Sequence, residues 1–213
     1  TGTPNDAFGY QALYSNTTGV NNVAVGYQSL FTQQTAGNNT AMGYQALYAN
    51  TTGSASVAIG TNALGSNTTG TNNVAVGAFS LNSATTGIYN TALGQGAAQS
   101  LTTGSYNVII GQAAGNTGTN NLTTGTNNVV IGQNAGTNAA GAVNRIVIGS
   151  GGIGQGDNYV SIGTGGTNYI YNQFNTNATW TKASDQRIKQ NIQDLPIGLD
   201  FINELKVKQY NWK

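Results

Sequence analysis

The side chains that could do acid, base or nucleophilic chemistry lie mostly near the C-terminus of the chain. The 213 residues include no cysteine and no histidine, which excludes disulfides, thiolate or imidazole metal ligands, and Cys/His or Ser/His nucleophilic pairs. Among the charged residues only Asp6 precedes Arg145. Asp200 and Glu204 are four residues apart, but a solvated helix face explains this spacing better than a general acid/base pair. We therefore expect no metal, no cofactor and no multiple-turnover enzyme.

The charge and hydropathy of the chain limit its partners. The net charge is +1, which predicts no binding to nucleic acid or to an anionic membrane surface. No apolar run reaches the roughly 18 residues of a membrane span. Most charges follow Lys182, which indicates a boundary near residue 180. The chain begins at Thr1 inside a repeat, and Pro4 to Gly9 is a degenerate copy of the repeated phrase, so we interpret the start as a fragment boundary.

Ten glycines recur at a nearly fixed interval, and each ends a short phrase such as Asn72-Asn73-Val74-Ala75-Val76-Gly77. The first seven glycines are each 17 residues apart, and the three intervals that follow are 21, 17 and 14 residues. The ten are Gly9, Gly26, Gly43, Gly60, Gly77, Gly94, Gly111, Gly132, Gly149 and Gly163. A period this short predicts one coil of a parallel β-solenoid. Ten coils about 4.8 Å apart would be about 45 to 50 Å tall.

The three residues before each glycine are apolar and mostly β-branched, which predicts short strands. Side chains alternate between the faces of a strand. If the first and third residues fill the coil, the middle one faces outward. The middle residues are nevertheless apolar: Ala24, Ala41, Ala58, Ala75, Ala92, Ile109, Val130 and Val147. We therefore predict that these eight residues form the interface of a homotrimer, since strands apolar on both faces are usually buried on both.

The second half of each repeat supplies a leucine and a turn. Leu13, Leu30, Leu47, Leu64 and Leu81 follow their glycines by four residues. The turn phrase, for example Asn50-Thr51-Thr52-Gly53, predicts a corner with positive φ. Asparagines one coil apart would form amide ladders. Tyr10, Tyr27 and Tyr44 would stack along one edge; such a row can bind sugars, but it more often supports the fold.

The phrase Asn-x-Val-Ala-Ile/Val-Gly resembles the head repeats of trimeric autotransporter adhesins over about residues 5–165. The resemblance implies a left-handed parallel β-roll that assembles as a trimer. The usual repeat of that family is near 14 residues, which only the interval from Gly149 to Gly163 matches.

The segment from Ser184 to Ile192, Ser-Asp-Gln-Arg-Ile-Lys-Gln-Asn-Ile, carries a second resemblance, which continues through Leu199, Phe201-Ile202, Leu205 and 207–213. It resembles the opening of the endosialidase-type intramolecular chaperone domain of phage tail spikes and fibres. That family promotes trimerisation, and many members then cut themselves away. Most of the domain would follow Lys213, so the segment is interpreted as truncated.

The resemblance gives Ser184 the role of the serine at the cleavage point and Lys189 that of the lysine that activates it. The scissile bond would then be Ala183–Ser184. An amine of lowered pKa can serve as the base for a serine hydroxyl where no histidine exists. The alternative is that Ser184 and Asp185 cap a turn or helix and that Lys189 is a solvated charge.

These observations predict an all-β, homotrimeric β-solenoid with 17-residue coils and a short α+β C-terminal segment. Residues 1–163 would form the shaft, 164–183 an aromatic neck, and 184–213 the beginning of the chaperone domain, with a helix over 196–205 and a strand over 207–212. The predicted function is a structural segment of a phage tail fibre, on a virion or at an extracellular surface. Its partners would be further copies, other tail or fibre proteins, and a host-surface glycan or protein. The alternatives are a bacterial surface adhesin and an ice-binding solenoid.

Overall fold

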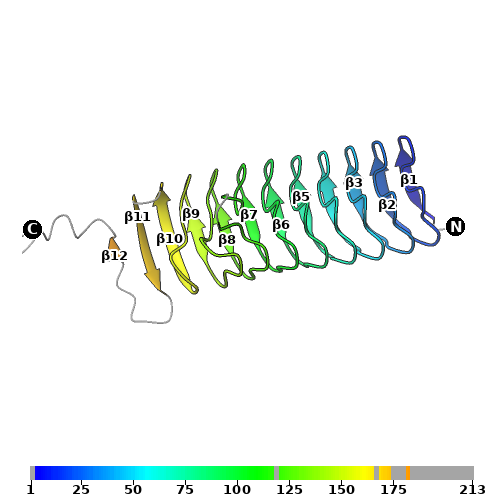
Figure 1. Ribbon diagram of the computed structural model, residues 1–213. Helices are drawn as coiled ribbons and strands as arrows, with labels where there is room; N and C mark the ends of the chain where they lie inside the picture. The colour runs from blue at the N-terminus through cyan, green and yellow to red at the C-terminus, as the bar shows by residue number, and fades with distance from the viewer. Residues whose placement is uncertain (1–2, 118–119, 166–167, 174–180, 183–213) are drawn as a thin grey trace, which may run out of the picture. The chain divides into compact units, whose positions relative to one another are not determined.

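The computed structural model describes residues 3–117, 120–165, 168–173 and 181–182, and these residues contain twelve strands and no helix. The strands form one sheet in which each lies beside its neighbours in the chain (Figure 1). Their bounds are β1 Asn5–Phe8, β2 Asn22–Val25, β3 Thr40–Met42, β4 Val57–Ile59, β5 Val74–Val76, β6 Thr91–Leu93, β7 Val108–Ile110, β8 Val129–Ile131, β9 Ile146–Ile148, β10 Tyr159–Thr164, β11 Asn168–Gln173 and β12 Thr181–Lys182.

Strands β1 to β10 are parallel, and each pairs with the equivalent residues of the next coil. Ala58 pairs with Ala75, and Val57 with Val74. Figure 1 shows these coils stacked in a row, with their strands side by side along one side of the stack. The predicted all-β fold, the parallel β-solenoid and its 17-residue coil are therefore confirmed.

The glycine that ends each phrase is required by its conformation and by its neighbour. Gly60 has a φ of +130°, and a Cβ added there would lie 2.7 Å from the carbonyl carbon of Gly77 in the next coil. Any side chain would therefore push two coils apart, in a backbone conformation that L-residues rarely adopt. Close stacking of the coils thus explains the most regular feature of the sequence.

The corner at the Asn-Thr-Thr-Gly phrase differs from the prediction. Positive φ occurs before the strand, as at Asn72 (58°), and in the turn after it, as at Gln45 (52°) and Leu47 (51°), but not at Asn50 or Gly53. Instead the Asn50 Nδ2 donates to the Gly53 carbonyl at 2.8 Å, and a Cβ at Gly53 would collide with Gly70. The phrase therefore makes a side-chain-closed turn that needs room for the next coil.

The interior of the coils combines apolar side chains with an asparagine ladder. Leu30, Leu47, Leu64 and Leu81 are fully buried, whereas Leu13 in the first coil is only partly buried. The predicted amide ladder is also present: the Asn90 N–H donates to the Asn73 Oδ1 at 2.9 Å, and Asn107 repeats this contact with Asn90 at 3.1 Å. Ser56 takes one step of the ladder, accepting from the Asn73 N–H at 3.2 Å. Each step satisfies a backbone donor that would otherwise be buried without a partner.

The parallel order ends at β10, which pairs in parallel with β9 and antiparallel with β11; β11 then pairs antiparallel with β12. Part of the segment predicted as a neck thus forms antiparallel strands. The predicted helix over 196–205 and strand over 207–212 lie outside the described residues. Within the described ranges no helix is long and apolar enough to cross a membrane.

Candidate functional site

The eight residues predicted to form a trimer interface lie in the interior of the coil. Ala24, Ala41, Ala58, Ala75, Ala92, Ile109, Val130 and Val147 are at most 1% exposed in a single chain. The assumed orientation of the strand, with the middle residue facing outward, is therefore wrong. Side chains do alternate between the two faces of the strand, but the middle residue points into the coil and the first and third residues point outward. Side chains with no exposed surface in one chain have none to offer to another.

The physical reason is the small volume inside a 17-residue coil. In the N-terminal coils the interior pairs an alanine with a leucine, for example Ala58 with Leu64. In the β7 coil the corresponding pair is Ile109 and Gly115, and a Cβ added at Gly115 would lie 3.4 Å from the Ile109 Cγ2. In the β7 and β8 coils a larger middle residue, Ile109 or Val130, therefore accompanies a glycine six positions later. This exchange indicates that both residues fill the same space.

The outward positions are the first and third of the three residues that precede each phrase glycine in β2 to β9, together with Ile162 of β10, and we call them the outer strand face. All are half-buried or exposed in the chain. Met42 is 42% exposed, Ile59 38% and Ile162 37%. The outer strand face consists of Val23, Val25, Thr40, Met42, Val57, Ile59, Val74, Val76, Thr91, Leu93, Val108, Ile110, Val129, Ile131, Ile146, Ile148 and Ile162.

The outer strand face carries no charge. Its only polar residues are Thr40 and Thr91, and the nearest carboxylate in the same column is Asp6 of β1, which pairs with Val23. The two threonines are the sequence signal that could have fixed the orientation. Threonine occurs at the first position and never at the middle one, as expected if the first position is the one that meets solvent.

Aromatic stacks border the outer strand face. The predicted stacking of Tyr10, Tyr27 and Tyr44 is confirmed, with ring centroids 5.3 Å apart. A second stack, Tyr14–Phe31–Tyr48, follows four residues later, and Tyr89 stacks on Tyr106 just before β6 and β7. Tyr27 has a stacked ring on both sides, whereas Tyr10 and Tyr14, at the ends of their stacks, are 64% and 66% exposed.

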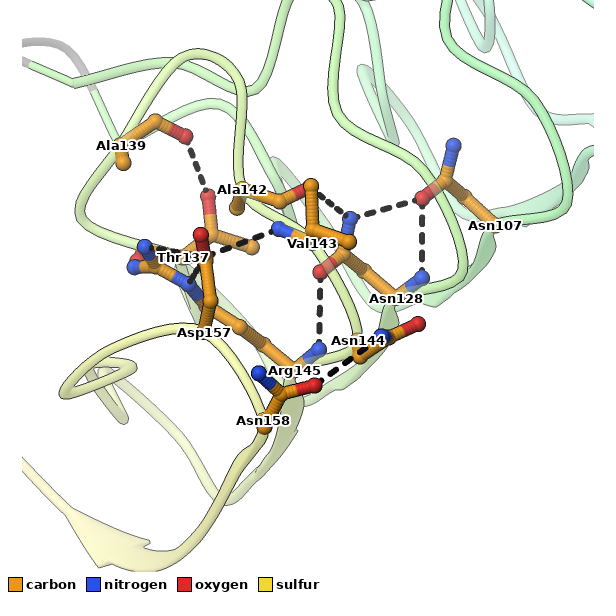
Figure 2. A network of polar contacts seen from close by, with 10 residues as sticks. All are labelled: Asn107, Asn128, Thr137, Ala139, Ala142, Val143, Asn144, Arg145, Asp157 and Asn158. Atoms are coloured by element: carbon orange, nitrogen blue, oxygen red, sulfur yellow. Dashed lines mark hydrogen bonds and ion pairs between the residues drawn. The ribbon is translucent and has the colours of Figure 1, made fainter. Parts of the chain in front are cut away.

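The asparagine ladder reaches Arg145, which takes the place of the next asparagine and forms an ion pair with Asp157 (Figure 2). The Arg145 N–H donates to the Asn128 Oδ1 at 3.0 Å, and its Nη2 lies 2.7 Å from the Asp157 Oδ1. Arg145 is 8% exposed and also donates to the Thr137 carbonyl. The Val143 backbone N–H and the Arg145 guanidinium lower the pKa of Asp157, with the N–H contributing more. This cluster closes the ladder and shows no arrangement for catalysis.

Other candidate sites are sparse in the described part of the chain. There, no group of three or more His, Cys, Asp or Glu residues could hold a metal ion. A small cavity of about 150 Å³ is lined by Thr117, Asn134, Gly136, Asn138, Gly151 and Ile153, none of which titrates near neutral pH. The predicted cleavage residues Ser184 and Lys189, and also Asp200 and Glu204, lie outside the described residues.

The molecule is therefore a parallel β-solenoid with an apolar outer strand face. Residues 184–213 match the family model described as chaperone of endosialidase, so the resemblance proposed for this segment is confirmed. No curated protein and no solved structure matches the chain.

Proposed function

We propose that the chain is a structural segment of a trimeric fibre, in a phage tail or a phage-derived particle. The observation that carries the proposal is the order of the two parts: an almost uncharged β-solenoid is followed by a segment that matches an intramolecular chaperone family. A protein whose product is an assembly needs a shaft and a means of bringing copies together. The match with an assembly chaperone also supports self-association.

The solenoid suits the role of a shaft because each coil contacts mainly its neighbours, so that length is set by the number of repeats. Hydrogen bonds between coils are not confined to the strands. In the turns, the Leu47 N–H donates to the Ala63 carbonyl and the Leu64 N–H to the Ser80 carbonyl, both at 3.0 Å. Such a structure resists bending and presents repeated side chains at fixed spacing. We propose other tail or fibre proteins as its axial partners and a host-surface glycan or protein as its target.

The trimer is tested by the mass of the 213-residue chain in solution. The monomer is 21.8 kDa, so multi-angle light scattering should give three times that mass, about 65 kDa. The reason is that a strand apolar on both faces is usually covered on both. A monodisperse species of single-chain mass at micromolar concentration would contradict the proposal.

We further propose one self-cleavage, between Ala183 and Ser184, with Ser184 as nucleophile and Lys189 as its base. The family match at 184–213 supports this assignment. Expression of the complete gene followed by intact-mass analysis should show a new N-terminus at Ser184. Ser184→Ala should abolish the cut, and Lys189→Arg should slow it strongly because arginine stays protonated. Ser150→Ala is the matched control and should be cut normally; an uncut wild type would contradict the proposal.

A further inference from the structure

The outer strand face is apolar along the whole row of coils, yet nothing in a single chain covers it. It extends over nine strands, β2 to β10, and about three residues along each. With strands about 4.8 Å apart and about 3.3 Å per residue, this strip is about 40 Å long and 10 Å wide, or about 400 Å². This area is in the range of the largest apolar patch on a typical monomeric protein, about 300 to 600 Å², and such a patch often marks an interaction site.

We propose that the outer strand face is the surface through which copies of this chain contact one another, with the solenoids parallel and in register around a common axis that runs along the row of coils. The inference rests on the proposed trimeric fibre and adds to it the contact residues and their register. It replaces the alanine column as the interface.

A second copy is the occupant because the strip has the properties of a self-complementary surface. It contains no charge, so identical copies do not repel one another there. Its columns repeat every coil, since Val76 pairs with Ile59 on one side and with Leu93 on the other. Equivalent residues of parallel copies would therefore meet at every level. A partner of different sequence would have to reproduce the same spacing over nine strands.

The width of the strip favours convergence on an axis over flat pairing. A stable pair needs about 800 Å² on each partner, and the strip supplies about half of that. When several copies point this strip toward one axis, the residues on its two borders also come into contact. The border before the strands has Tyr89 and Tyr106, and the border after them has Tyr27 and Tyr44.

These borders are compatible with parallel, in-register packing. In that arrangement the border before a strand lies beside the border after the equivalent strand of the next copy. Tyr27 of one copy would then lie beside Asn21 on the facing border of the next copy, and Tyr89 would lie beside Gln95. Between β2 and β9 no coil has an aromatic residue on both borders, so two rings never compete for the same space at one level.

The chain contains no cysteine, so single cysteines can report the contact directly. Val25, Val76 and Ile148 lie in the same column, in β2, β5 and β9. In the full chain we expect Val25→Cys, Val76→Cys and Ile148→Cys each to give cross-linked chains with a short bis-maleimide or under oxidation, because like residues face one another near the axis. Ser66→Cys is the control: Ser66 is exposed and lies about half a coil from the strands, so it should remain uncross-linked.

Mixing Val25→Cys chains with Ile148→Cys chains during assembly tests the register. These positions are seven coils apart, about 34 Å, so parallel copies cannot join them. A Val25–Ile148 product without like-with-like products would overturn the parallel arrangement. A three-chain mass without cross-linking at any of the three positions would overturn the proposed face while leaving the trimeric fibre intact. A single-chain mass for the unmodified chain would contradict the fibre itself and this inference with it.

Val76→Asp provides a measurement that does not depend on cross-linking. We expect it to shift the mass by light scattering toward one chain, because a carboxylate would be buried against identical carboxylates. The far-UV spectrum should keep its β character, since Val76 does not face the coil interior. Ser66→Asp should keep the mass of the unmodified chain. Retention of the three-chain mass by Val76→Asp would overturn the proposed face.

Discussion

The N-terminal coils around β2 to β5 and the C-terminal coils around β7 and β8 have equivalent strands paired in the same register, but they are filled differently. The first set uses a small middle residue and a leucine, as in Ala58 and Leu64, whereas the second uses a large middle residue and a glycine, as in Ile109 and Gly115. Leu101 and Leu122 also enter the core, at positions close to those of Asn50 and Asn67 in the turn phrase. The difference indicates that the space beside the middle strand residue can be filled from either position of the pair.

The largest expected effect on stability comes from converting the pair Ile109 and Gly115 into the alanine–leucine pair of the N-terminal coils. Ile109→Ala should lower the free energy of unfolding by about 2 to 4 kcal/mol, because it leaves a cavity. Gly115→Leu alone should also destabilise, by about 1 to 3 kcal/mol, since its side chain would overlap Ile109. The double variant restores the N-terminal pattern, Ala with Leu, and should recover at least 1 kcal/mol relative to additivity.

Urea denaturation of the four proteins in this cycle measures the coupling. Leucine is acceptable in the backbone at this position, because Leu81 occupies the equivalent place at a φ of 47°. Ala113→Ser, on a half-buried residue outside the core of the same coil, serves as the control and should change the stability little. If the effects of Ile109→Ala and Gly115→Leu on the free energy of unfolding are additive, the two side chains do not compete for the same space in the coil.

The asparagine ladder should not distinguish the two regions. Asn73 accepts the Asn90 N–H and donates to the Gly87 carbonyl at 2.8 Å; Asn107 accepts the Asn128 N–H and donates to the Gly125 carbonyl at 2.9 Å. Asn73→Ala and Asn107→Ala should therefore cost similar amounts, about 1 to 3 kcal/mol each, because a buried donor loses its partner.

Serine at the same positions is the matched control for the ladder. Ser56 already occupies one step, and its Oγ accepts a backbone N–H, so Asn73→Ser and Asn107→Ser should cost less than the alanine variants. Thermal unfolding of the four variants gives the comparison. A loss confined to one region would mean that the ladder is uneven in strength.

The smallest expected effect lies at the end of the ladder, where Asp157 pairs with Arg145. The folded state lowers the pKa of Asp157, so this contribution to stability is present above the ordinary carboxyl pKa and is lost as the pH falls through the lowered value. Asp157 is about half exposed, so solvent screening keeps the contribution small. Asp157→Asn should lower the melting temperature slightly at pH 7 and should show a smaller further decrease in acid than the parent chain.

The acid comparison isolates Asp157 because the parent and the variant share all the other carboxylates. Asp6→Asn, which changes a carboxylate at the opposite end of the described coils, is the control. If the parent chain and Asp157→Asn have the same acid dependence, the ion pair does not contribute to closing the ladder.

Much of the coil could be predicted from the sequence because its features are local and repeated. The strand Val74–Val76, the buried Leu64 and the stack of Tyr27 on Tyr44 follow from the types of residues and from the period. The orientation of the strand could not be derived from alternation alone, because alternation fixes which residues share a face but not which face is inside. Thr91, and the replacement of the alanine–leucine pair by Ile109 and Gly115, contained that information. They could be interpreted only once the structure showed which side chains lie inside the coil.

The sequence by itself determined the repeat, the parallel coils, the ladder and the likeness of residues 184–213 to an assembly chaperone, because each depends on residues at fixed spacing. Only the tertiary structure decided that Ala75 points inward and Val76 outward. The physical reason is volume: in the coil that holds Ala75, the interior is already occupied by leucine and asparagine and has room for a methyl group on the strand. The larger side chains must lie outside the coil, where they give the chain its apolar surface.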